Sequence, residues 1–191
     1  MTTPKDIPWG EVGYATYKRT YARPFKNRTE EWPETIERVV EACNKQLGCD
    51  FTDQEQDDIR EMMMSLKGTV AGRFLWQLGT KTVDRLGLPS LQNCAFTVVD
   101  EPIRPFTWAF EMLMLGSGVG FNIQREHVYQ IPKVKKKVKI TREDVNDADF
   151  IVPDSREGWV ELLRRVLEAS FVTGEGFTFA THLIRSKGSA I

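Results

Sequence analysis

Residues 91–123, LQNCAFTVVDEPIRPFTWAFEMLMLGSGVGFNI, constrain the fold more than any other part of this chain. The segment from Cys94 to Val99 is rich in β-branched and aromatic residues and lacks glycine and proline, which predicts a strand. Pro105 suits a first helical position, and residues 106–115 are apolar on most sides, which predicts a buried helix. A glycine-rich turn over 116–120 then leads into another strand. This order of elements favours an α/β fold.

The turn has the sequence Gly116-Ser-Gly-Val-Gly120. Because glycine has no side chain, the backbone here can turn sharply and approach a ligand closely. Its backbone N–H groups are therefore candidates to bind phosphate oxygens. The spacing fits neither GxGxxG nor the Walker A loop, so the motif by itself is weak evidence for nucleotide binding. A non-catalytic nucleotide-binding module and a helical interaction domain stay open as alternatives to an enzyme.

Composition excludes several classes of function. The 191 residues suffice for a domain with its own core, and 41% hydrophobic with 28% charged residues is ordinary for a globular protein. A formal net charge of -1 argues against a general nucleic-acid binder. No apolar run has the length of a membrane span, and the first residues lack a signal-peptide core. Three cysteines do not make a secreted disulfide framework, so we expect a cytoplasmic protein.

The first 90 residues are predicted to be mainly helical. We expect helices from Pro33 to Gly48, from the capping box of Thr52 and Glu55 onward, and over residues 71–78. Before them, residues 14–23 alternate tyrosine with basic side chains, which is compatible with an RNA-binding segment or with an arm whose rings pack on the domain. The nearly neutral net charge favours packing.

Cys43 and Cys49 are separated by five residues, which is not the CxxC spacing of redox or zinc sites, and no histidine lies near them. We interpret both as structural. His127 and His182 have no carboxylate or nucleophile partner at a telling spacing, so they receive the same interpretation.

The second half of the chain contains further predicted elements. Residues 133–140, KVKKKVKI, alternate as in a strand with four lysines on one face, which either guard a solvated edge or bind a nucleotide triphosphate. The edge interpretation is favoured because lysine edges are common. An acidic loop over 143–149 follows, then a helix capped by Asp154, and then a strand over 177–184.

Several motifs, taken in order, resemble the amino-terminal part of ribonucleotide reductase, and most of all the monomeric adenosylcobalamin-dependent (class II) ribonucleoside-triphosphate reductases. They are the TYKRTYAR of residues 16–23, Arg73-Phe-Leu-Trp76 with Gly79-Thr80, Asn93-Cys94-Ala-Phe, Pro105-Phe106, LMLGSGVGF of 113–121, QIPKV of 130–134, DSREGWV of 154–160, and Ile184-Arg185. The resemblance implies a helical region over 1–90 and, over 91–191, the first part of the catalytic ten-stranded α/β barrel, left incomplete before the radical cysteine.

The resemblance also implies a chemistry. These reductases make deoxyribonucleotides for DNA replication: two thiols close to a disulfide and supply two electrons, while a third cysteine, as a thiyl radical, takes the 3′ hydrogen. Cys94 matches the first thiol of the reducing pair, and the matched substrate-binding residues are Asn93, Cys94, Ser117 and Gly118. The pocket for adenosylcobalamin falls beyond Ile191 in the family, and no metal site is expected in this chain.

The implied partners are a ribonucleoside triphosphate as substrate, a thioredoxin-like dithiol as reductant, and a carboxy-terminal reductase portion, supplied by a second polypeptide or by splicing. Without that portion we expect the chain to be inactive. A deoxynucleotide effector is a further candidate, but the region over 134–150, near which the relatives bind it, is short here. The segment between Cys94 and Pro105 is short as well, and no ATP-cone precedes the match.

Overall fold

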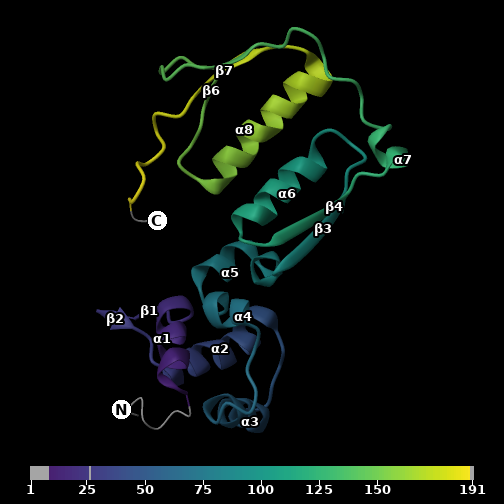
Figure 1. The fold of residues 1–191 in the computed structure, drawn as a ribbon. Coiled ribbons are helices and arrows are strands. Elements are labelled where there is room, and N and C mark those ends of the chain that lie inside the picture. The colour runs from purple at the N-terminus through teal and green to yellow at the C-terminus, as the bar shows by residue number, and fades with distance from the viewer. Residues whose placement is uncertain (1–8, 26, 190–191) are drawn as a thin grey trace. The chain divides into compact units, whose positions relative to one another are not determined.

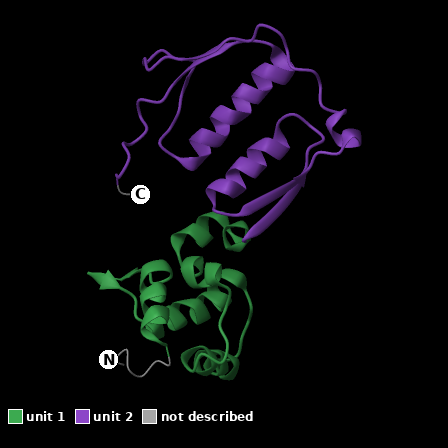
Figure 2. Ribbon diagram, in the orientation of Figure 1, with its two compact units in different colours: residues 1–92 green, residues 93–191 purple. Residues whose placement is uncertain are grey.

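The computed structural model describes residues 9–25 and 27–189. The chain divides into two compact units, residues 1–92 and residues 93–191 (Figure 2). The first unit is almost entirely helical, and the second combines parallel strands with helices (Figure 1). The fold is thus α/β, with several small sheets, and no helix in the described ranges is long and apolar enough to span a bilayer.

The first unit begins with a helix and a short hairpin, followed by a group of helices. Its elements are α1 (Glu11–Thr20), β1 (Pro24–Phe25), β2 (Arg28–Thr29), α2 (Trp32–Leu47), α3 (Asp53–Met64), α4 (Gly72–Gln77), α5 (Lys81–Leu86) and the 3-10 helix η2 (Leu88–Leu91). The helices predicted from Pro33 to Gly48, from the Thr52–Glu55 capping box onward and over 71–78 are confirmed as α2, α3 and α4. Helix α3 ends at Met64, shortly before Leu66, which adopts a left-handed backbone with φ of 55°.

Helix α2 is the centre of the first unit. A capping box of Glu31 and Glu34 begins it, and Gly48, with φ of 65°, ends it in the left-handed conformation that suits glycine. One face of α2 is fully buried, and the indole of Trp32 donates a 3.1 Å hydrogen bond to the carbonyl of Met63 in α3. The core around it consists of Tyr17, Trp32, Ile36, Val39, Val40, Ala42, Met63, Leu75, Leu78, Val83 and Leu91.

The aromatic residues near the amino terminus pack into this core. Tyr17 of α1 is only 2% exposed, and its ring lies edge-on to Trp32 at a centroid distance of 5.4 Å. Trp9 contacts both rings, with centroids 4.8 Å from each. The interpretation of this segment as an arm that packs its rings on the domain is confirmed.

A buried ion pair joins the hairpin to the helices of the first unit. The guanidinium of Arg38 in α2 donates two hydrogen bonds to the carboxylate of Glu30, of 2.6 and 2.8 Å. It also donates to the carbonyl oxygens of Leu75 and Leu78. Glu30 further accepts a hydrogen bond from the Thr35 hydroxyl at 2.9 Å. Burial raises the pKa of Glu30, but Arg38 and the other donors outweigh it, so the pKa lies below its ordinary value.

The second unit contains one pair of strands and one sheet of three strands. Its elements are β3 (Cys94–Val98), α6 (Arg104–Met114), β4 (Gly118–Asn122), α7 (Arg125–Val128), β5 (Ile140–Arg142), β6 (Phe150–Ile151), α8 (Arg156–Glu168), the π-helix η3 (Ala169–Thr173) and β7 (Phe177–Ala180). The predicted strand, buried helix and strand over 94–122 are confirmed as β3, α6 and β4. Strands β3 and β4 run parallel, so α6 is the crossover connection between them.

The three-stranded sheet has the order β5-β7-β6, and both pairings are parallel. Helix α8 connects β6 to β7 (Figure 1). The predicted acidic loop over 143–149 is present, and two of its carboxylates bind the central strand region: Asp149 accepts from the backbone of Thr178, and Asp144 from that of Thr181. The loop therefore fastens the ends of the sheet.

Three predictions for the second unit are wrong in detail. Residues 133–139 form no strand, and Lys137 has a φ of 66°, so the lysines do not share the face of a sheet edge. Helix α8 is capped by Ser155, whose hydroxyl accepts from the Gly158 backbone at 3.0 Å, whereas Asp154 forms an ion pair with Arg185. Strand β7 ends at Ala180, since the chain turns away before His182.

Candidate functional site

The four residues expected to bind substrate lie together at the start of strands β3 and β4. In the parallel register of the two strands, Cys94 is the partner of Gly118. Gly118 is also joined to the residue before Cys94, because its N–H donates a 2.8 Å hydrogen bond to the carbonyl oxygen of Asn93. Ser117 precedes Gly118 directly. The β3–α6–β4 crossover thus brings residues 24 positions apart into adjacent places.

The thiol of Cys94 belongs to the open face of the β3–β4 pair. Successive strand residues point to opposite faces, and Thr97 with Phe121 faces α6, where both line a groove with that helix. Cys94 and Gly118 therefore belong to the other face, and Cys94 is exposed. Helix α6 covers only one side of the pair (Figure 1). A reactive thiol at this position is accessible to a ligand.

Gly118 leaves free space beside this thiol. A Cβ atom built on it would meet only the Asn93 carbonyl oxygen, at 3.7 Å, which is ordinary contact. The glycine is therefore not required by packing, and its backbone is not in the left-handed region. Gly116 differs, since its φ of 83° is the turn conformation that favours glycine. A bare backbone at position 118 suits the close approach of a ligand to Cys94.

The prediction that the turn cradles phosphates with its N–H groups does not hold for its first three residues. Gly116 donates its N–H to the Leu113 carbonyl at 2.8 Å, and Ser117 donates to Met112 at 3.0 Å. Gly118 donates to Asn93, as described above. Hydrogen bonds within the protein thus occupy these donors, because the turn also closes the carboxyl end of α6. Ser117 is only 3% exposed, so any ligand contact there needs a close approach.

One residue on the Cys94 face escaped the sequence interpretation. Phe96 lies two residues after Cys94, on the same face of β3, and is 64% exposed. Its ring lies against Gly120, where an added Cβ would come within 3.1 Å of the ring. The alternation of side chains along a strand was the available signal. Cys94 and Phe96 thus stand beside two glycines, Gly118 and Gly120, on one open face.

The opposite face of the β3–β4 pair forms an apolar groove of about 810 Å³ with the helices of the second unit. Its lining is hydrophobic apart from one threonine and comprises Thr97, Val99, Pro105, Phe106, Ala109, Phe110, Leu113, Phe121, Ile123, Val128, Ile131, Leu163 and Leu167. Such a surface offers no partner to phosphate groups or to the amide-bearing edge of a corrin ring. The groove is therefore a packing surface, and it does not fit adenosylcobalamin.

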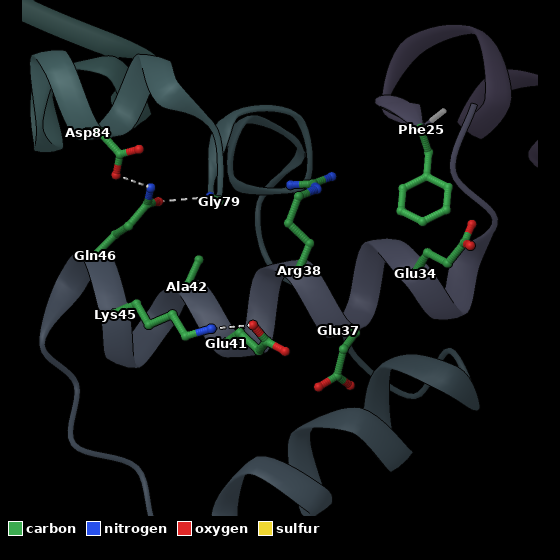
Figure 3. Close-up of a pocket in the computed structure, with 10 residues that line it drawn as sticks. All are labelled: Phe25, Glu34, Glu37, Arg38, Glu41, Ala42, Lys45, Gln46, Gly79 and Asp84. Atoms are coloured by element: carbon green, nitrogen blue, oxygen red, sulfur yellow. Dashed lines mark hydrogen bonds and ion pairs between the residues drawn. The ribbon is translucent and has the colours of Figure 1, made fainter. Parts of the chain in front are cut away.

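A second hollow, of about 580 Å³, lies in the first unit along α2 (Figure 3). Gln46 donates to the Asp84 carboxylate at 2.6 Å and accepts from the Gly79 N–H at 2.8 Å, while Lys45 pairs with Glu41. Its lining carries more carboxylates than cations: Glu34, Glu37, Glu41 and Asp84 against Arg38 and Lys45. Negative charge of this kind repels a triphosphate.

No metal centre is apparent among residues 9–25 and 27–189, where no three potential ligands from histidine, cysteine, aspartate and glutamate come together. The neighbour of His127 is the carboxylate of Glu126, 3.9 Å away on the surface. Cys94 is the residue that the sequence predicts to be reactive. Within the described residues, it lies exposed on the open face of a strand, next to Gly118.

The known proteins that match this chain are ribonucleotide reductases. Residues 1–80 match the family model described as ribonucleotide reductase alpha domain. A solved structure of a B12-dependent (class II) ribonucleotide reductase superposes on 97% of this chain and 34% of its own, with a TM-score of 0.77 and 29% sequence identity. The fold and the match together define the class: this chain is similar to part of a ribonucleotide reductase.

The similarity is more specific at the level of sequence. The adenosylcobalamin-dependent ribonucleoside-triphosphate reductase of Lactobacillus acidophilus is 31% identical over 85% of this chain, and that of Levilactobacillus brevis is 32% identical over 88%. The enzyme of Lactobacillus leichmannii is 34% identical over 80%. The chain therefore matches the adenosylcobalamin-dependent ribonucleoside-triphosphate reductases, and it spans about 30% of the length of these relatives. The resemblance read from the motifs is confirmed.

The alignment with the Lactobacillus acidophilus enzyme extends over 223 positions, more than the 191 residues of this chain, so the relative carries insertions.

Proposed function

We propose that this chain supplies the substrate side of a ribonucleoside-triphosphate reductase, with Cys94 as one of the two thiols that reduce the ribose. The observation that carries the proposal is the pairing of Cys94 with Gly118 across two parallel strands, on a face that α6 leaves open. An exposed thiol next to a bare backbone meets the two needs of such a site, which are access for the ribose and access for an external reductant.

The reaction fixes what Cys94 must do. Replacing the 2′-hydroxyl of a ribonucleotide by hydrogen consumes two electrons and two protons and releases water. Two thiols supply both and become a disulfide, which an external dithiol of the thioredoxin type then reduces. Cys94 is exposed enough for the first of these steps and for the thiol exchange that follows.

The second thiol of the pair is not identified in this unit, where Cys94 is the only cysteine of the sequence between residues 93 and 191. We infer that it belongs to the reductase portion outside this chain, together with the radical cysteine. On this proposal the β3–β4 pair is part of the ten-stranded α/β barrel, and the remaining strands come from that portion. The chain by itself is then inactive.

Adenosylcobalamin is the cofactor of the similar enzymes. When bound, it supplies the radical that starts the reaction. The two hollows described above do not fit it, one being apolar and the other acidic, so we assign its pocket to the reductase portion outside this chain. A deoxynucleotide effector is left unassigned.

The test is the substitution Cys94→Ser in the active enzyme that contains this chain. Serine is close in size and keeps the fold, so the variant is expected to bind a ribonucleoside triphosphate with unchanged affinity. Multiple turnover with a dithiol reductant is expected to stop, because serine cannot form the disulfide. Cys43→Ser is the matched control and is expected to retain turnover. Deoxynucleotide formation by Cys94→Ser at the rate of the unmodified enzyme would remove Cys94 from the mechanism.

A further inference from the structure

The two other cysteines of the chain are brought together at the carboxyl end of α2. Gly48, with φ of 65°, reverses the chain after the helix. Cys49 then lies back over the last turns, and its backbone N–H donates a 3.1 Å hydrogen bond to the carbonyl oxygen of Cys43. A direct backbone hydrogen bond is compatible with the Cα separation of about 4.4–6.8 Å that a disulfide spans.

The loop that carries Cys49 is held in place on its other side as well. The side-chain amide of Asn44 donates to the carbonyl of Phe51 at 2.9 Å, and its oxygen accepts from the Phe51 N–H at 2.9 Å. Thr52 follows as the cap of α3, where its hydroxyl accepts from the Glu55 N–H. Cys49 is therefore fixed between two anchored positions, next to the turn of α2 that carries Cys43.

The two thiols differ in exposure, and they affect one another. Cys43 is half-buried beside the core of the first unit, whereas Cys49 is exposed. Burial raises the pKa of the Cys43 thiol, and the nearby Cys49 thiol raises it further through charge and hydrogen bonding. Both cysteines are reduced in the structure. The spacing of Cys43 and Cys49 in the sequence had suggested two separate structural residues. Spacing alone does not show that the chain reverses direction at Gly48.

We propose that Cys43 and Cys49 are a reversible redox pair that closes to an intramolecular disulfide on reaction with a low-molecular-weight disulfide. Such a modification site is distinct from Cys94 and takes no part in ribose reduction. The exposed Cys49, as thiolate, attacks one sulfur of the oxidant and releases the other half as a thiol. The Cys43 thiolate then attacks the Cys49 sulfur and releases the second thiol. In total the protein loses two protons and two electrons, and the oxidant gains them as two thiols.

Oxidised glutathione tests the proposal on the full chain carrying Cys94→Ser, so that only this pair can react. The folded protein is incubated with the oxidant, acid-quenched, alkylated and analysed by mass spectrometry with peptide mapping. The expected product has lost two hydrogen atoms, resists alkylation at both positions and returns to the dithiol with dithiothreitol. A stable glutathione adduct at Cys49, with no disulfide to Cys43, would overturn the proposal.

Single substitutions assign the order of the steps. Cys43→Ser is expected to accumulate the glutathione adduct at Cys49, because the resolving thiol is missing. Cys49→Ser is expected to form an adduct at Cys43 roughly tenfold more slowly, since that thiol is half-buried. Equal rates for the two variants would contradict the assignment of Cys49 as the thiol that attacks the oxidant.

Asn44→Ala tests whether the fold positions the pair. The variant loses both hydrogen bonds to Phe51, so the loop is freer and Cys43 should resolve the adduct several-fold more slowly. Circular dichroism checks that α2 is intact. An unchanged lifetime of the adduct, or a disulfide that forms only in urea, would show that the folded geometry does not promote closure.

Discussion

The backbone N–H of Gly118 donates a 2.8 Å hydrogen bond to the carbonyl oxygen of Asn93. This bond joins the residue before Cys94 to the glycine turn, and it sets the register in which Cys94 is the partner of Gly118. Because a shift of one residue would move the Cys94 thiol to the face that carries α6, the bond also keeps the thiol on the open face. The glycine turn thus has two tasks: to close α6 and to align β4 with β3.

Gly118→Val is expected to weaken binding of the ribonucleoside triphosphate by the active enzyme that contains this chain. The side chain would occupy the bare surface beside Cys94, where we propose that the ribose approaches. The fold should persist, since the added Cβ meets only the Asn93 carbonyl, at an ordinary 3.7 Å. Substrate affinity is measured by equilibrium dialysis, and thermal unfolding shows that the chain remains folded.

Gly118→Ala provides the matched control for this substitution. A single methyl group adds less bulk than the branched side chain, so the loss of affinity should be smaller than for valine. If Gly118→Val binds substrate normally while remaining folded, the assignment of this surface to the substrate is wrong.

The arrangement of β3, α6 and β4 could be predicted because its signals are local. The β-branched run after Cys94, Pro105 at the helix start and the glycines after the helix each favour one conformation. Their pairing in space could not be derived from periodicity, and it is the structure that shows it. The role of the turn donors was missed for two reasons: Gly116 donates to Leu113 in the local turn that ends α6, and Gly118 donates to Asn93, a contact that depends on tertiary structure.

Arg38→Ala is expected to destabilise the first unit by about 3–5 kcal/mol, the cost of leaving the buried Glu30 carboxylate without its cation. Arg38 has a side chain only 14% exposed, and Glu30 only 5%. The substitution also removes the donors to Leu75 and Leu78, which link α2 to the region of α4. Urea unfolding followed by tryptophan fluorescence measures the change in the free energy of unfolding.

Arg60→Ala is the control on the same unit, because its partners Glu37 and Asp57 lie at the surface. Exposed ion pairs of this kind contribute roughly 0–1 kcal/mol. A similar loss of stability in both variants would mean that burial of the Arg38–Glu30 pair is not what makes it important.

The stability of the first unit is expected to fall as the pH decreases from about 4.5 to about 2. Hydrogen bonding from Arg28 is the main cause that lowers the pKa of Glu34 to about 2, from an ordinary 4.5, and the Glu31 N–H adds to it. A carboxyl group with a lowered pKa in the folded state stabilises the fold above its unfolded pKa, and this contribution is lost on acidification.

Glu34→Gln tests this origin of the acid sensitivity. The variant should be less stable than the unmodified chain at pH 7, and the two should converge toward pH 2. Chemical denaturation at several pH values measures both. A constant difference across the range would show that Glu34 does not titrate with a lowered pKa.

The lysine segment and the cysteine pair show where sequence patterns fail for a physical reason. Alternation over 133–140 indicated a strand, but a strand needs a partner edge, and Lys135 instead donates its N–H to Ser170 after α8. Cys43 and Cys49 were judged by their separation along the chain, although Gly48 places them next to each other. In both cases a backbone hydrogen bond to another part of the chain decides the local structure. The pattern of side chains along the sequence does not reveal such a bond.

The chain is expected to bind a hydrophobic dye such as ANS in its native state. The apolar groove between the β3–β4 pair and the helices of the second unit presents Leu113, Phe121 and Ile123, each more than half exposed. Apolar surface of this extent is what such dyes recognise.

Phe121→Ser and Leu113→Ser should each lower the dye fluorescence of the folded chain. Leu88→Ser, at a residue 61% exposed in the first unit, should leave the fluorescence unchanged. Near-ultraviolet circular dichroism separates this result from a loosely packed chain, because a native signal must persist while the dye binds. A folded chain that binds no dye would mean that the groove is closed in solution, and it would count against our proposal that further barrel strands and helices pack on this unit.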